Sequence, residues 1–206
     1  MGRQLILLLG GARSGKSSYA EKLVKTLGKR VIYVATAQAG DEEMQARIAV
    51  HRQARPAEWR TVEAPTGVGP AVSAALAAGP ADAVLLDCVT MLISNLILAG
   101  LSEADLELEN LDDAAARARV DAELDDLLAA FRASDIPWVL VSNEVGCGVV
   151  PPYALGRVYR DLLGWANQRL AAEADKAYFM VAGFPLDLKA LSADLLLDGK
   201  IGRAHV

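Results

Sequence analysis

Cysteine is scarce in this sequence: Cys88 and Cys147 are the two in 206 residues. So few cysteines cannot build a disulfide scaffold, and no signal-peptide pattern opens the chain, so we expect a protein of the reducing cytoplasm. Both cysteines are then expected to be small buried hydrophobic side chains. Histidine is equally scarce, and His51 is the only one away from the C-terminal tail, which ends with His205 and Val206.

Long apolar runs and linkers are also missing, although 53% of the residues are hydrophobic. The apolar stretches end well short of the ~20 residues that a membrane span needs, so no membrane span is predicted. No internal repeat, low-complexity tract or Pro/Gly/Ser-rich linker divides the chain. We therefore expect a single domain over residues 1–206, with a mobile tail from about residue 194.

Positive charge is in deficit overall, with a net charge of −5, but the excess of acid is local. Residues 102–126 carry ten acids and two arginines, and the remainder carries 16 acids and 19 Lys/Arg. Such a mildly basic remainder suits a phosphate-rich small ligand better than an extended nucleic acid. The charges of the acidic segment are expected to form a solvated helix face.

The most informative stretch follows the apolar run of residues 5–9. It fits G-x-x-x-x-G-K-[ST], and its residues are Gly10, Gly11, Ala12, Arg13, Ser14, Gly15, Lys16 and Ser17. Glycines let the backbone N–H groups turn inward around a phosphate, and a helix N-terminus faces the same anion. Lys16 is expected to reach the β- and γ-phosphates and Ser17 to hold Mg²⁺. The alternative is a plain glycine-rich turn, which the amphipathic helix pattern after it disfavours.

Strand and helix patterns alternate along the rest of the chain. This alternation predicts an α/β fold with a doubly wound, mostly parallel sheet. The strand over residues 31–36 is expected to lie beside the first one, and the strand over 176–181 to be the last. The remaining predicted strands cover 59–63, 83–87 and 138–142, and the predicted helices cover 16–27, 40–55, 68–78, 90–98, 112–132, 153–174 and 191–197.

Asp87 ends an apolar strand pattern. In phosphate-loop proteins the acid in this position completes the Mg²⁺ shell, usually through water. A helix cap for the segment from Thr90 is the alternative. A glycine- and proline-rich loop over residues 143–152, with Glu144 in it, follows a later strand and is predicted to form a substrate wall.

The predicted helix over 40–55 carries the internal histidine. His51 shares a face with Arg55, and Arg47 and Arg52 are close to it in the sequence. Arginines at the carboxyl side of the sheet could clamp a second phosphate group. A packed histidine beside a solvated basic face is the alternative.

Several stretches together resemble one family, the bifunctional adenosylcobinamide kinases/adenosylcobinamide-phosphate guanylyltransferases of cobalamin biosynthesis. The resemblance spans about residues 5–182. The matching stretches are residues 10–17, 33–37, 41–44, 47–48 with His51, 55–63, 86–90, 95–96, 142–146 with Pro151, and 167–171. The family consists of RecA-like P-loop NTPase domains that form homotrimers, so the resemblance implies both properties here.

The resemblance implies two successive reactions. ATP or GTP phosphorylates the hydroxyl of adenosylcobinamide, and GTP then donates GMP to that phosphate, with release of pyrophosphate. GMP is carried on a histidine, which corresponds to His51; some relatives have two adjacent histidines where this chain has Val50 and His51. Lys16 and Asp87 are the further catalytic residues, and Ser17 with Asp87 would hold Mg²⁺. The implied nucleotide contacts are residues 10–17, Ala35, Thr36, Ala37, Arg52, Gln53, Ala54, Arg55, Glu63 and Asp87.

Two other functions use the same phosphate loop. A small-molecule kinase would form no covalent nucleotide adduct. A GTP-dependent switch would time the release of a partner, but the chain has no Asn-Lys-x-Asp tetrapeptide for reading guanine.

Overall fold

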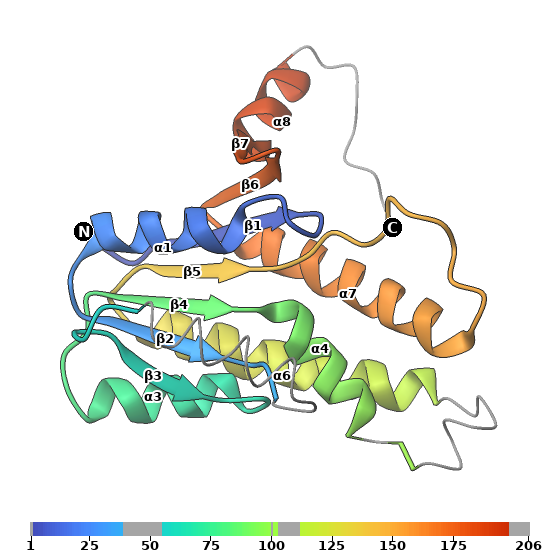
Figure 1. Ribbon diagram of the computed structural model, residues 1–206, viewed down its shortest axis with the longest axis horizontal. Helices are drawn as coiled ribbons and strands as arrows, with labels where there is room; N and C mark the ends of the chain where they lie inside the picture. The colour runs from blue at the N-terminus through green and yellow to red at the C-terminus, as the bar shows by residue number, and fades with distance from the viewer. Residues whose placement is uncertain (1, 39–54, 100, 103–111, 198–206) are drawn as a thin grey trace.

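The computed structural model describes residues 2–38, 55–99, 101–102 and 112–197, with side chains up to residue 192. Strands and helices alternate through most of this part (Figure 1). The strands are β1 (Leu5–Gly10), β2 (Val31–Ala35), β3 (Arg60–Glu63), β4 (Ala83–Asp87), β5 (Trp138–Val141), β6 (Lys176–Val181) and β7 (Phe184–Asp187). The helices are α1 (Lys16–Leu27), α3 (Val68–Ala77), α4 (Val89–Leu98), α6 (Asp113–Ala133), α7 (Ala154–Glu173) and α8 (Leu188–Leu197).

The described strands form one seven-stranded sheet in the order β3-β2-β4-β5-β1-β6-β7. All neighbours run parallel except β6 and β7, which form an antiparallel hairpin. The α/β fold with a mostly parallel sheet is therefore confirmed. Because the strands are parallel, the loops that leave their carboxyl ends gather at one edge, where such sheets bind ligands.

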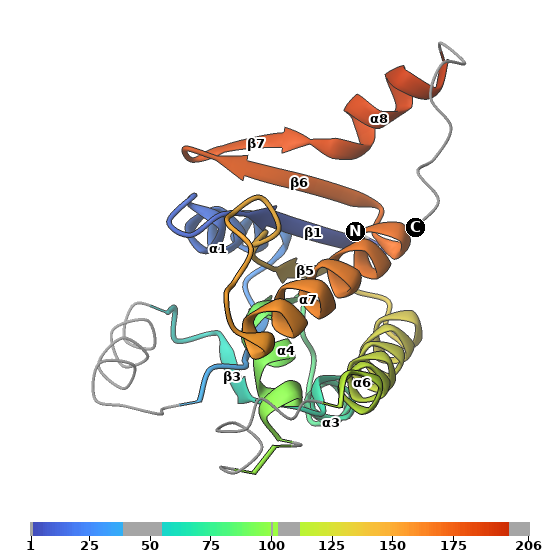
Figure 2. The ribbon, with the colours of Figure 1, turned by 90° about the vertical axis from the view of Figure 1, so that its right-hand side faces the viewer.

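Helices cover both faces of the sheet (Figure 2). One face packs against α3, α4, α6 and α7, and the other packs against α1 and Trp59. Each residue of β1 is buried, as expected for a central parallel strand with apolar neighbours on both sides.

Three expectations about the elements are wrong. β2 does not lie beside β1, because β4 and β5 lie between them. An apolar run shows that a strand is buried on both faces, but it does not identify its neighbours. β6 is not the last strand, since β7 follows it at the sheet edge, where Pro185 needs no N–H for pairing. The last helix begins at Leu188 rather than at residue 191.

In the described part of the acidic segment, Asp112, Asp113, Asp125 and Asp126 are exposed as expected, and Glu123 is the exception. Glu123 of α6 is buried, and its carboxylate accepts hydrogen bonds from the backbone N–H groups of Gly67 and Val68 at 2.8 and 2.7 Å. These groups belong to the N-terminus of α3, whose N–H groups need an acceptor. Asp121, also on α6, forms ion pairs with Arg117 and Arg169.

Candidate nucleotide-binding site

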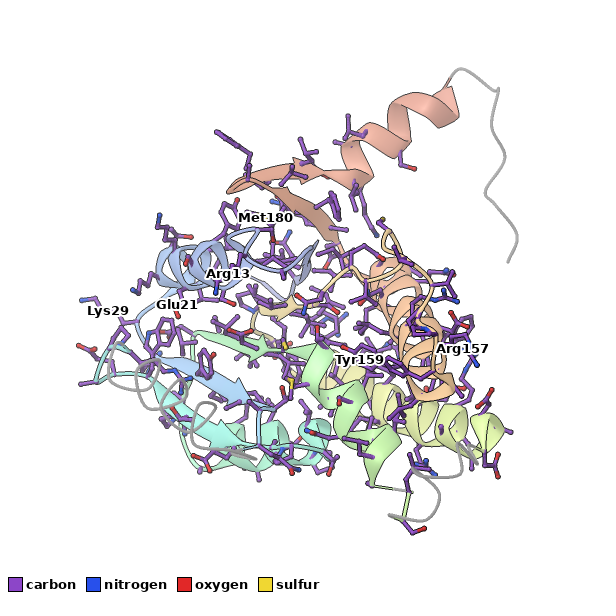
Figure 3. All side chains as sticks on the ribbon, turned by 45° about the vertical axis from the view of Figure 1, so that its right-hand side comes forward. Arg13, Glu21, Lys29, Arg157, Tyr159 and Met180 are labelled. Atoms are coloured by element: carbon purple, nitrogen blue, oxygen red, sulfur yellow. The ribbon has the colours of Figure 1, made fainter. Side chains whose placement is uncertain are left out.

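The phosphate loop connects β1 to α1 and depends on glycine at two positions. Gly10 has a φ of 150°, and a Cβ on it would lie 2.6 Å from the backbone oxygen of Met180. Gly15, directly before α1, has a φ of 93°, in the left-handed region that favours glycine. Figure 3 labels Arg13 on this loop and Met180 on the adjacent strand β6. Backbone shape and close packing thus require the two glycines that the motif contains.

Two other segments hold the loop from its sides. The N–H of Glu144, after β5, donates to the carbonyl oxygen of Gly10 at 3.0 Å. The N–H of Gly183, in the turn between β6 and β7, donates to the carbonyl oxygen of Ser14 at 3.0 Å. The loop is therefore preorganised by the strands on both sides of β1.

Lys16 lies within the loop with only 7% of its surface exposed. Its Nζ donates to the carbonyl oxygen of Gly11 at 2.6 Å and to Ser14 Oγ at 3.4 Å. Burial lowers the pKa of Lys16 below its ordinary value, and neighbouring Cys88 and Asp87 act in the opposite direction. The ammonium thus gains from any anion that enters the loop, as a triphosphate would.

Asp87 lies beside the start of α1. Ser17 Oγ donates to Asp87 Oδ1 at 3.5 Å, and the hydroxyl of Tyr33 donates to Asp87 Oδ2 at 3.0 Å. The alternative role as a helix cap is wrong, because α4 has Cys88 as its N-cap residue and no side-chain cap. The peptide bond between Asp87 and Cys88 is cis.

The pair of Ser17 and Asp87 fits Mg²⁺ by the chemistry of its donors. A hydroxyl and a carboxylate are hard oxygen ligands, and Mg²⁺ commonly takes one or two protein oxygens plus phosphate and water. Among the described residues, no group of three or more His, Cys, Asp or Glu side chains could hold a metal ion.

The polar groups of Thr36, just after β2, are hydrogen-bonded within the fold. Thr36 is fully buried, and its hydroxyl donates to the Cys88 carbonyl at 2.7 Å and accepts from the Cys88 N–H at 2.9 Å. The side chain of Asn95 donates to the Thr36 carbonyl at 2.8 Å. These bonds tie the ends of β2 and β4 together, so the Thr36 hydroxyl is engaged inside the fold. Ala35 and Ala37 flank it at the same edge of the sheet.

Arg55 is the described member of the predicted arginine cluster. Its guanidinium carbon lies 3.5 Å from the centre of the Tyr33 ring, and its Nη1 donates to Thr61 Oγ1 at 3.2 Å. It packs on an aromatic ring instead of forming part of a solvated basic face. Glu63 ends β3 at the same edge of the sheet. His51, Arg52, Gln53, Ala54 and Arg47 lie outside the described residues.

Tyr33 was not predicted as a site residue. Burial, followed by the nearby charge of Asp87, raises its pKa far above the ordinary value, so the phenol remains a hydrogen-bond donor. A signal was present in the sequence: a tyrosine within an aliphatic buried strand needs a partner for its hydroxyl.

The loop after β5 differs from the phosphate loop in character. Val149 is 96% exposed and Val150 60% exposed, with Tyr153 next to α7. The Glu144 carboxylate accepts from the N–H of Gly146 at 2.6 Å, so it stabilises its own turn.

Cys147 is exposed, which contradicts its expected burial, whereas Cys88 is partly buried; both are free.

None of the helices within the described ranges has the length and apolarity needed to cross a membrane.

Comparison with known proteins gives a family match over most of the chain. Residues 6–188 match the family described as cobinamide kinase / cobinamide phosphate guanyltransferase. The chain is 44% identical over 185 residues to the bifunctional adenosylcobalamin biosynthesis protein CobU of Salmonella typhimurium, covering 90% of this chain and 99% of that protein.

Two further relatives are similar to the same extent. CobU of Escherichia coli K12 is 41% identical over 185 residues, covering 90% of this chain and 99% of its own length. The bifunctional adenosylcobalamin biosynthesis protein CobP of Pseudomonas aeruginosa is 43% identical over 183 residues, covering 89% of this chain and 96% of its own length.

Proposed function

Since the chain belongs to the cobinamide kinase / cobinamide phosphate guanyltransferase family, we propose that one nucleotide site, at the carboxyl edge of its sheet, serves both reactions. The protein is a bifunctional transferase: it phosphorylates cobinamide and transfers a guanylyl group to the resulting phosphate. The observation that supports a single site is that Lys16, Ser17 and Asp87 lie together at the start of α1.

In the kinase step the chain mainly positions groups and stabilises charge. The glycine loop and the N-terminus of α1 would hold the phosphates of ATP or GTP through backbone N–H groups. Lys16 would leave its bond to the Gly11 carbonyl and pair with the β- and γ-phosphates, which compensates for the burial of its charge. The hydroxyl of adenosylcobinamide would then attack the γ-phosphorus.

Ser17 and Asp87 are the residues that would hold Mg²⁺. The ion would supply positive charge to the phosphate oxygens in the transition state. The protein residues would fix its place, with Ser17 at the first turn of α1 and Asp87 at the end of β4.

In the guanylyl step we assign the nucleophile to His51. A neutral imidazole, with a reference pKa near ~6.5, can attack the α-phosphorus of GTP and later leave from GMP. Arg55, four residues further along the chain, is anchored on Tyr33, whose hydroxyl bonds Asp87. This anchor supports an assignment in which His51 and Arg52 serve the same nucleotide, with contacts from residues 10–17, Ala35, Thr36, Ala37, Gln53, Ala54 and Glu63.

The test is capture of labelled GMP from α-labelled GTP. Wild-type protein should form a phosphoramidate adduct, labile to acid and stable to alkali. His51→Ala should abolish the adduct while retaining cobinamide kinase activity, and His205→Ala, the other histidine, should leave it unchanged. An adduct that persists in His51→Ala would refute the assignment, and no adduct in the wild type would favour a kinase that lacks nucleotidyl transfer.

We extend the proposal to assembly and location. A homotrimer is supported by apolar side chains that the described surface leaves exposed, including Phe184 of β7, 72% exposed. A cytoplasmic location agrees with two free cysteines. Light scattering coupled to gel filtration should give three times the 21.8 kDa of one chain.

A further inference from the structure

Tyr33 lies where two parts of the nucleotide site meet. It is in the middle of β2 with 4% of its surface exposed. Its ring stacks on Trp59, with 6.2 Å between ring centres and 24° between their planes, which fixes the ring's orientation. The hydroxyl points to Asp87, and the ring carries Arg55 on its face.

The two carboxylate oxygens of Asp87 have different partners, and the hydroxyl of Tyr33 is one of them. Oδ2 accepts from Tyr33 at 3.0 Å, and Oδ1 faces Ser17 Oγ at 3.5 Å. The terminal torsion of an aspartate is broad, so a carboxylate without such a partner can rotate. A donor fixed by ring stacking therefore selects one rotation, with Oδ1 toward Ser17.

The face of the ring also holds Arg55, whose charge acts on the nearby phenol as well. The guanidinium carbon is 3.5 Å from the ring centre, within the distance of a cation–π contact, and Nη1 bonds Thr61. Arg55 Nε is buried and has no hydrogen-bond partner in the described part of the chain. The stacking therefore has a large part in fixing where this guanidinium lies.

We propose that Tyr33 is a positioning residue with two roles: its hydroxyl orients Asp87 for the metal–nucleotide complex, and its ring seats Arg55 for the guanylyl step. This inference rests on the proposed function, because it needs Asp87 to serve the metal and Arg55 the nucleotide. Hydrogen-bond partners of metal-binding carboxylates typically change metal affinity by about 10-fold or more.

Tyr33→Phe tests the hydroxyl, because it keeps the ring. Binding of Mn²⁺, followed by electron paramagnetic resonance in the presence of a non-hydrolysable GTP analogue, should weaken about 10-fold. Affinity for the same analogue in EDTA, without metal, should stay within about twofold of the wild type, since Phe keeps the ring that Arg55 stacks on and the lost hydrogen bond is the one to Asp87. Tyr178→Phe on β6 is the matched control and should bind Mn²⁺ like the wild type.

Tyr33→Leu tests the ring. It should repeat the metal defect of Tyr33→Phe and in addition slow formation of the GMP adduct, measured in a single turnover at saturating Mn²⁺. Tyr33→Phe should form the adduct at close to the wild-type rate under the same saturating metal. Equal adduct rates in the Phe and Leu variants would overturn the role of the ring.

The variant Asp87→Asn distinguishes two failures: that of the role given to the Tyr33 hydroxyl, and that of the proposed metal site. If Asp87→Asn weakens Mn²⁺ binding and Tyr33→Phe does not, the role of the hydroxyl is overturned and the metal assignment stands. If Asp87→Asn leaves Mn²⁺ binding unchanged, the metal assignment fails, and the role of the hydroxyl fails with it. Weaker binding in both variants supports both.

Discussion

Two clusters in this molecule have nearly the same construction. In each, an arginine stacks on an aromatic ring, with Arg55 at 3.5 Å from Tyr33 and Arg117 at 3.7 Å from Trp165. The polar hydrogen of each ring system is donated to an aspartate at 3.0 Å, from Tyr33 to Asp87 and from Trp165 Nε1 to Asp121. One cluster lies at the phosphate loop and the other between α6 and α7.

The clusters differ in the charge of the groups that donate hydrogen bonds to the aspartate. Asp121 also pairs with the guanidinium groups of Arg117 at 3.0 Å and Arg169 at 3.2 Å. Within the described residues, the side-chain hydrogen bonds of Asp87 come from two hydroxyls. A carboxylate that already has two guanidinium partners stabilises the fold, whereas one held by neutral donors keeps charge for a cation. We infer that this difference separates the functional aspartate from the structural one.

The largest expected effect comes from removing each charge in turn. Asp87→Asn should lower kcat of both reactions by about 100-fold at fixed Mg²⁺, because it removes the charge that we propose holds the metal. Asp121→Asn should leave both within about twofold, since the partners of Asp121 are Arg117, Arg169 and Trp165 on α6 and α7 and not residues of the phosphate loop. Steady-state assays of the two variants check this. Full kinase activity in Asp87→Asn would remove the distinction between the clusters.

For the free energy of unfolding, the Asp121 variant should show a larger effect than the Asp87 variant. Asp121→Asn should reduce the free energy of unfolding by about 1 kcal/mol, because it weakens two ion pairs on a partly exposed carboxylate. Asp87→Asn should reduce it by less, since within the described residues the carboxylate has hydroxyl partners and the nearby charge of Lys16 but no ion pair as close as those of Asp121. Urea titration at neutral pH measures both. A larger loss in Asp87→Asn would contradict the comparison.

The pH dependence of stability sharpens the same contrast. Burial acts to raise the pKa of Asp121, but hydrogen bonds from Trp165 and Arg117 and the charges of both arginines outweigh it, so the pKa lies below its ordinary value. Asp121 therefore stabilises the fold above its unfolded pKa, about 3.9, and this contribution is lost as pH falls through the folded value. Asp121→Asn should lose less stability than the wild type between neutral pH and acid. Parallel curves would contradict this sign.

The smallest effect is expected from the stacked arginine of the second cluster. Arg117→Met keeps much of the side-chain packing on Trp165 and removes the charge. The free energy of unfolding should fall by about 0.5 kcal/mol, the usual worth of an exposed pair four residues apart on a helix. Thermal unfolding of the variant and the wild type measures it, and no change in stability would contradict it.

Much of the fold could be predicted from the sequence where local patterns determine it. The phosphate loop, the strand before it and the helix after it follow from glycine chemistry and apolar spacing. The sequence places Asp87 at the carboxyl end of a strand, and the structure brings it to Ser17 as expected, although its role there stays a prediction.

Strand order and hidden polar contacts could not be predicted in this way. The neighbours of β2 depend on packing by later elements, and β7 is a short edge strand with alternating exposure and a proline. Glu123 looks like one more acid on a charged helix. Its position three residues after buried Val120 places it on the apolar face, where it meets the N-terminus of α3. The sequence indicated that the hydroxyl of Tyr33 needs a partner, but the structure is needed to identify that partner as Asp87.

The central place of β1 has a consequence for how the protein is made. Its two neighbours, β5 and β6, are synthesised late, and the Gly183 N–H that braces Ser14 comes later still. A growing chain therefore exposes both edges of its first strand through most of translation, and such distant parallel pairings form slowly. The phosphate loop should accordingly reach its final shape only after residues up to 183 have been made and have paired with it.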